Sequence, residues 1–267
     1  MEKLTEFEAF KWIETPTTKK RTERSGGHFV DELVPPGFEG YLKIFHAIYE
    51  DLSITDHTLS WHDLEGPTIR RLFPGDERTQ ELLKGSVVTH GAPSGPFPKE
   101  RIRWRELAER CGLIFHPEIN DSSFSRQFTG RSWPRYLVGP SEGYLDSASF
   151  CAFVNTLAAL SGDQDCYFYF DVMATKDYTS PLLFRGQIAE AVSVVAVADT
   201  QDTPTYWWPP DHSWCLCTDH DLPFSIFGGN ARVLAALEEQ PELEVTRVTL
   251  LHRVDYKADR VNEKRDA

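Results

Sequence analysis

The chain has 267 residues, enough for one large domain or two small ones, and its 40% hydrophobic, 12% aromatic and 26% charged composition excludes a disordered, collagen-like or coiled-coil protein. Its net charge of −13 is uneven: residues 1–140 hold 21 acids and 19 bases, a net of −2, and residues 141–267 hold 20 acids and 9 bases, a net of −11. This acidity opposes nucleic-acid phosphates and anionic lipid surfaces and attracts basic partners, although it also keeps many proteins soluble without any partner.

The amino-terminal stretch MEKLTEFEAF lacks the apolar core of a secretory signal. The longest apolar run, AVSVVAVA (191–198), is far shorter than the roughly 20 residues of a membrane-spanning helix. Five cysteines are scattered without the spacing of a disulfide framework. We therefore expect a cytoplasmic protein with reduced thiols and no membrane partner.

In chain order, residues 7–14 (FEAFKWIE) are predicted to form a strand, and residues 15–27 (TPTTKKRTERSGG) a polar, mobile loop. Residues 32–51 are apolar at so many successive positions that we expect a buried segment, either strand or helix. Prolines and glycines mark residues 91–100 as a linker. This linker predicts an N-terminal region over 1–98, which could form a subdomain, and an α+β domain over 99–267.

Two helices and a strand are predicted in the middle of the chain. Residues 102–112 (IRWRELAERCG) have apolar residues at helical spacing and end at a glycine, and Cys111 is expected in the core. A second helix is expected between Asp146 as N-cap and Gly162. Residues 166–172 (CYFYFDV) are typical of a strand.

The last third has the most regular pattern. Residues 214–218 and 223–227 are predicted to form a hairpin, followed by a helix capped by Asn230 and a strand over 243–251. This hairpin-helix-strand unit predicts an α+β fold with a mixed or antiparallel sheet and helices packed on one face. The residues expected in the core are Trp104, Leu107, Phe153, Leu157, Phe168, Phe170, Leu216, Ile226, Leu234 and Leu237.

The stretch DHSWCLCTDH (211–220) raises the question of a metal site. If it is a strand, Cys215 and Cys217 share one face, whereas His212 and His220 point to the other with Trp214 and Leu216. The one-residue spacing also differs from the cysteine knuckles of structural zinc sites. We therefore expect no metal and no cofactor here, and buried thiols.

Other candidate chemistry is weak in the sequence. Pro117 favours an extended backbone that separates His116 from Glu118. The aspartates Asp211, Asp219 and Asp221 flank the hairpin and could bind a cation, but turn aspartates usually accept local backbone hydrogen bonds. The glycines of FSIFGGNARVL (224–234) match neither a P-loop nor a dinucleotide fingerprint.

The aromatic stretch YWWPPDHSW (206–214) has two interpretations, an exposed binding surface or part of the core. Exposed aromatic residues often form binding hot spots, which makes Trp207 and Trp208 candidates for partner binding. The core reading is favoured, because adjacent residues of an extended chain point in opposite directions.

Three segments carry a resemblance: VPPGFEGYLKIFH (34–46), IRWRELAERCGLIFHPE (102–118) and residues 206–245. Their Pro-x-Gly-Phe-x-x-Tyr, Arg-Trp-x-Glu-Leu-Ala, His-Pro-Glu and Trp-Trp-Pro-x-Asp-x-x-Trp-Cys patterns are similar to those of a family of uncharacterised bacterial proteins, with Ala47 in place of a frequent proline. This resemblance implies no particular biochemical activity. The acidic end, with Trp-Pro-x-Asp-x-x-Trp and a Gly-Gly turn, more distantly resembles SUKH-type immunity proteins, which implies binding of a toxin through an acidic face.

Two hypotheses follow. The first is a non-catalytic cytosolic interaction protein, of an immunity-like or regulatory kind, that binds a basic protein partner through the acidic C-terminal half, with Trp207, Trp208, Asp211, Asp219 and Asp221 as contact residues. The alternative is a metal- or small-molecule-dependent enzyme. Its site would be assembled from dispersed residues such as His46, His116, Asp171 and His212.

Overall fold

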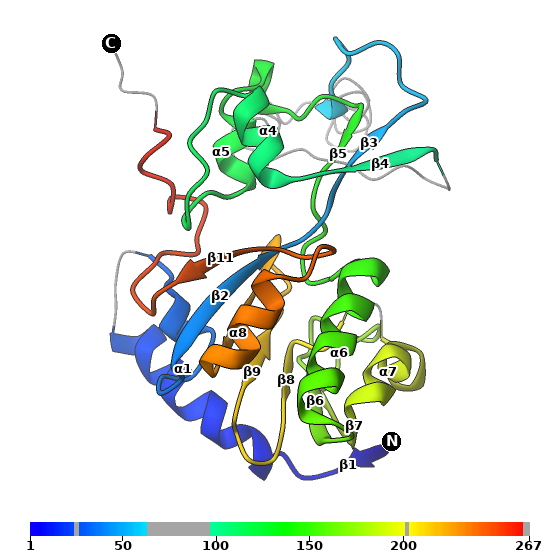
Figure 1. The fold of residues 1–267 in the computed structure, drawn as a ribbon, viewed down its shortest axis with the longest axis vertical. Helices are drawn as coiled ribbons and strands as arrows, with labels where there is room; N and C mark the ends of the chain where they lie inside the picture. The colour runs from blue at the N-terminus through cyan, green and yellow to red at the C-terminus, as the bar shows by residue number, and fades with distance from the viewer. Residues whose placement is uncertain (24–26, 63–96, 201–202, 264–267) are drawn as a thin grey trace. The chain divides into compact units, whose positions relative to one another are not determined.

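A computed structural model describes residues 1–23, 27–62, 97–200 and 203–263 (Figure 1). The chain forms two compact units. The first comprises Met1–His46, His116–Glu118 and Ser141–Ala258, and the second comprises Ala47–Phe115, Ile119–Pro140 and Asp259–Ala267. This division differs from the predicted boundary at residue 98, because strand β2 (Gly40–Phe45) pairs with two strands from the end of the chain. Most of the linker predicted at 91–100 lies outside the described residues.

The α+β class is confirmed, and the main sheet is antiparallel. In the described part of the first unit, eight strands are ordered β1-β7-β6-β8-β9-β10-β2-β11. Besides β2 they are β1 (Glu2–Leu4), β6 (Asp165–Phe170), β7 (Leu182–Gln187), β8 (Tyr206–Trp208), β9 (Cys215–Cys217), β10 (Phe224–Gly229) and β11 (Glu244–Val248).

Three helices pack on one face of this sheet: α6 (Ser147–Ser161), α7 (Ala191–Ala198) and α8 (Ala231–Glu238) (Figure 1). The predicted start and end of α6 are confirmed. The Asp146 side chain accepts hydrogen bonds from the backbone N–H groups of Ala148 and Ser149, and Gly162 has a φ of 66° after the last turn. Phe153 and Leu157 of α6 and Leu234 of α8 are fully buried against the strands.

The other face of the sheet is covered by the N-terminal segment, where the sequence prediction was wrong. Residues predicted as a strand and a loop form a 3₁₀ turn, η1 (Glu8–Phe10), and helix α1 (Lys11–Glu23). Phe10, Ile13 and Thr17 are buried, and their spacing of three and four residues is helical. A second 3₁₀ turn, η2 (Val30–Glu32), is buried beside them.

The predicted hairpin-helix-strand unit is confirmed. Strands β9 and β10 pair antiparallel, with Leu216 opposite Phe227. The Asn230 side chain accepts a hydrogen bond from the Val233 N–H at 3.0 Å and caps α8. Strand β11 then returns beside β2.

The described part of the second unit contains a small antiparallel sheet and two short helices. Its strands are β4 (Lys99–Ile102), β3 (Ile48–Asp51) and β5 (Leu137–Val138), in the order β4-β3-β5, and its helices are α4 (Trp104–Arg110) and α5 (Asp121–Ser125). Helix α4 confirms the prediction for residues 102–112. The core of the second unit is aromatic, with the rings of Trp104 and Trp133 packed against Phe124. Cys111, predicted in the core, is only partly buried.

All ten residues predicted in the core are buried: Trp104, Leu107, Phe153, Leu157, Phe168, Phe170, Leu216, Ile226, Leu234 and Leu237. Among the described residues, no helix has the length and apolar character needed to cross a bilayer.

Candidate functional site

The tryptophans named as partner-binding candidates are core residues. Trp207 and Trp208 are each 0% exposed and lie on opposite faces of the sheet. The Trp207 ring packs against Phe153, and the Trp208 ring packs against Tyr167. Neither offers surface to a partner, so the partner-binding assignment of both residues is corrected to the favoured core reading.

The DHSWCLCTDH stretch divides into a strand and two turns. Cys215 and Cys217 are buried on the same face as Trp208, and burial raises the pKa of both thiols. The predicted direction of His212 was wrong, because this residue lies outside β9 (Cys215–Cys217), where the alternation of strand side chains does not apply. His212 lies in a turn with a φ of 58°, and its ring stacks on Trp12, which packs on the same face as the cysteines.

The three candidate aspartates separate in space. Asp211 stays in its own turn, where it accepts hydrogen bonds from the N–H and hydroxyl of Ser213 and from Gln164. Asp219 and Asp221 lie in the turn between β9 and β10. There they help to form a pocket, whereas Asp211 is not among the residues that line it.

This pocket, called the acidic pocket from here on, belongs to the first unit and has a volume of about 370 Å³. Four segments contribute to it: α1, the segment around η2, the β9–β10 turn and the loop after β11. It is lined by Arg21, His28, Glu32, Leu33, Asp219, His220, Asp221, Leu222, Val254, Asp255 and Tyr256. Four of these side chains are carboxylates.

His220 is surrounded by aspartates. Its Nδ1 lies 3.5 Å from an Asp171 oxygen and 3.9 Å from an Asp219 oxygen, and its Nε2 lies 3.4 Å from an Asp221 oxygen. Asp221 is well exposed, whereas Asp171, Asp219 and His220 are partly shielded. The Asp219 carboxylate also accepts a hydrogen bond from the Asp221 N–H, which holds the turn in shape.

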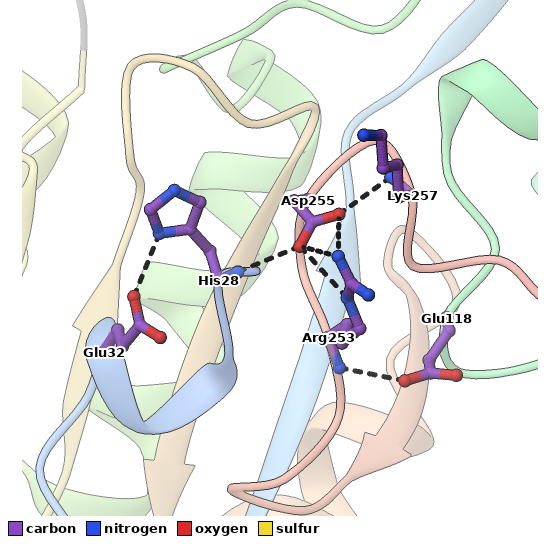
Figure 2. Close-up of polar contacts among 6 residues, drawn as sticks. All are labelled: His28, Glu32, Glu118, Arg253, Asp255 and Lys257. Carbon is purple, nitrogen blue, oxygen red and sulfur yellow. Dashed lines mark hydrogen bonds and ion pairs between the residues drawn. The ribbon is translucent and has the colours of Figure 1, made fainter. Parts of the chain in front are cut away.

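A second imidazole–carboxylate pair is formed by His28 and Glu32 (Figure 2). The His28 Nδ1 lies 2.9 Å from Glu32 Oε2. The two side chains differ in environment, since the histidine side chain is 71% exposed and the glutamate side chain 3%. Among the described residues, Glu32 Oε1 is buried and has no hydrogen-bond partner.

The fourth carboxylate of the pocket, Asp255, is already neutralised. It pairs with the Arg253 guanidinium at 2.8 Å and accepts hydrogen bonds from the backbone N–H groups of His28 and Lys257 (Figure 2). Burial raises the pKa of Asp255, but the hydrogen bonds from His28, Arg253 and Lys257 outweigh it and leave the pKa below its usual value. The backbone N–H of Arg253 in turn donates to Glu118 Oε1 at 2.9 Å.

Glycine at residue 27 leaves this arrangement undisturbed. A Cβ at this position would lie 2.6 Å from Arg253 Nη2 and 2.8 Å from an Asp255 oxygen. Its φ of 151° is also one that side-chain-bearing residues rarely adopt. The backbone at His28 is therefore held close to the Arg253–Asp255 pair.

The residues named for an enzyme site do not come together. His46 is 1% exposed and hydrogen-bonded to the Ser141 carbonyl and the Ser225 hydroxyl. His116 accepts a hydrogen bond from the Glu118 N–H, and His212 stacks on Trp12. Of the four, Asp171 alone lies next to the acidic pocket, through His220.

The sequence prediction missed His28 and Glu32. The one signal in the sequence is their spacing of four residues. This spacing brings two side chains together only where the backbone turns, as it does in η2. His220 was noted only as a flank of the cysteines.

One side of the pocket has donors suited to a cation. Asp219, His220 and Asp221 each offer a ligand atom, and these atoms lie within 4.8 Å of one another. Two carboxylate oxygens and one imidazole nitrogen are a donor set found at manganese, iron and zinc sites.

Comparisons with protein-family models, with curated proteins and with solved structures find no match for this chain. The two sequence resemblances therefore stay predictions, and the chemistry of the acidic pocket rests on its own residues.

Proposed function

We propose that the protein is a non-catalytic cytoplasmic interaction protein whose acidic pocket binds a basic group of a protein partner. The observation that supports this is the convergence of Glu32, Asp219 and Asp221 on one pocket of side-chain size. Arg21 offsets one of these charges, and Asp255 is paired with Arg253. The remaining field is negative and favours a cationic ligand.

The charge of the whole chain supports the same proposal. Residues 141–267, which supply Asp219 and Asp221, hold 20 acids and 9 bases. Such a field speeds the approach of a basic partner and weakens as salt screens it. The resemblance to SUKH-type immunity proteins is the reason for expecting an immunity-like or regulatory role.

The test is capture of a partner from host extract at low salt, read by native mass spectrometry. A double variant, Asp219→Asn with Asp221→Asn, should lose the partner. Asp211→Asn is the matched control, because Asp211 carries the same charge in the same part of the chain but lies in its own turn. Equal capture by the double variant and the wild type would contradict the proposal.

A second candidate function is metal-dependent chemistry, favoured by the donor set of Asp219, His220 and Asp221. These residues would hold the ion, which would supply Lewis-acid chemistry at the pocket. Dialysis against Zn²⁺ or Mn²⁺ followed by elemental analysis should then find one ion per chain in the wild type and none in His220→Gln. Equal metal content in both proteins would count against this function.

A further inference from the structure

We propose that the basic group is the guanidinium of a partner arginine and that Glu32 is its main ligand. This inference rests on the proposed function, because it names the chemistry of the group that the acidic pocket receives. It adds a residue that neither the net charge nor the aspartates of the β9–β10 turn indicate.

The Glu32 carboxylate is incompletely satisfied. The whole residue is 2% exposed, Oε2 is paired with His28, and Oε1 is buried without a hydrogen-bond partner in the described part of the chain. A buried carboxylate oxygen that has left water and gained no donor destabilises the free protein. A ligand that brings a donor to Oε1 removes this penalty, which makes Glu32 a stronger anchor than an exposed acid.

The partner of Oε2 is easy to displace. The His28 side chain is 71% exposed, so it can turn into solvent when an incoming donor replaces it at Glu32 Oε2, and the buried carboxylate is then never left without a donor. The His28 backbone is held separately, since its N–H donates to Asp255 at 2.9 Å (Figure 2). The imidazole is therefore free to turn into solvent while the main chain keeps its place.

Once His28 has turned away, the geometry of the Glu32 carboxylate favours arginine over lysine. A guanidinium presents two parallel N–H donors that match both oxygens of one carboxylate, whereas an ammonium is a single point charge. One arginine can take the position of His28 at Oε2 and also satisfy Oε1. A lysine at the same place leaves one oxygen without a donor.

The rest of the pocket suits the stem of such a side chain. Leu33, Leu222 and Val254 give apolar wall for the methylene groups, and Asp219 and Asp221 contribute negative field. The volume of about 370 Å³ is many times that of a single ion or water molecule.

The experiment titrates the full chain with N-acetyl-arginine methylamide and, separately, with N-acetyl-lysine methylamide, by calorimetry at low salt. Their blocked ends leave the side chain as the one charge. We expect the arginine compound to bind roughly tenfold more tightly, from two charge-assisted hydrogen bonds against one. Glu32→Gln should remove this preference, and the control Asp211→Asn should keep it.

A second variant covers the case in which Glu32→Gln fails to fold. His28→Ala removes an exposed side chain that competes for Oε2, so it should bind the arginine compound more tightly than the wild type does. In the wild type, arginine should also shift the His28 ring signals in the NMR spectrum.

Equal affinity for arginine and lysine in the wild type overturns the inference, and so does an unchanged arginine preference in folded Glu32→Gln. Weaker arginine binding by His28→Ala also overturns it. These results differ from failure of the proposed function. Arginine preference without any captured partner contradicts the interaction role and supports the guanidinium site. A partner captured equally by wild type and Glu32→Gln contradicts Glu32 alone.

Discussion

The buried imidazole of His46 predicts acid sensitivity of the first unit. Burial lowers the pKa of His46 from 6.5 to about 4, although the hydrogen bond to the Ser141 carbonyl and the charge of Asp146 oppose this shift. In the unfolded chain the imidazole regains its ordinary pKa. Between these two values the unfolded state binds a proton that the folded state does not.

The direction of the pH dependence of stability follows from this difference in pKa. Because the folded pKa is the lower one, the stability linked to His46 is fully present above about pH 6.5 and is lost as the pH falls toward 4. A difference of this size corresponds to about 3 kcal/mol, of which about 2 kcal/mol is lost by pH 5.

The assay is urea unfolding of the wild type and His46→Gln at a series of pH values from 7.5 to 4.5. Glutamine keeps an amide donor for the Ser141 carbonyl but takes up no proton. Other histidines and the carboxylates titrate in both proteins, so their contribution cancels in the comparison. We expect the variant to lose about 2 kcal/mol less than the wild type between pH 7 and pH 5. Parallel pH profiles for the two proteins would refute the reasoning.

Three further predictions concern packing, capping and thiol reactivity. Trp207→Ala should cost about 3–5 kcal/mol in urea unfolding because the ring is fully buried, yet leave partner capture unchanged where the variant is folded. Asn230→Ala should cost about 1 kcal/mol through loss of the α8 cap, whereas Asn230→Asp, which keeps the cap, should cost less. Titration with Ellman's reagent should leave Cys166, Cys215 and Cys217 unreactive until the chain unfolds, since burial raises the pKa of each thiol.

A fifth prediction concerns Gly27. Gly27→Ala should destabilise the first unit more than Gly37→Ala in thermal unfolding. Both glycines have a positive φ, but a Cβ at Gly37 meets nothing within 4 Å, whereas one at Gly27 meets Arg253 and Asp255. Equal shifts in Tm would mean that backbone strain alone, rather than the close approach to the ion pair, requires glycine at residue 27.

Local sequence patterns predicted the secondary structure correctly where a single segment contains its own start, apolar and end signals. The helix from Asp146 to Gly162 has its cap, its apolar face and its terminating glycine within one stretch. The hairpin at 214–227 likewise pairs neighbouring residues. The strand prediction for the N-terminal segment was wrong because FEAFKWIE is short and its apolar pattern fits a helix as well as a strand. The choice between strand and helix was decided by the sheet face that Phe10 and Ile13 cover.

The sequence by itself determined the α+β class, the core residues and the charge imbalance, since these depend on residue type and on spacing within single elements. Only the tertiary structure decided which acids act together. The acidic pocket joins Glu32 to Asp219 and Asp221, which lie in the first and last thirds of the sequence, and no periodicity connects residues so far apart.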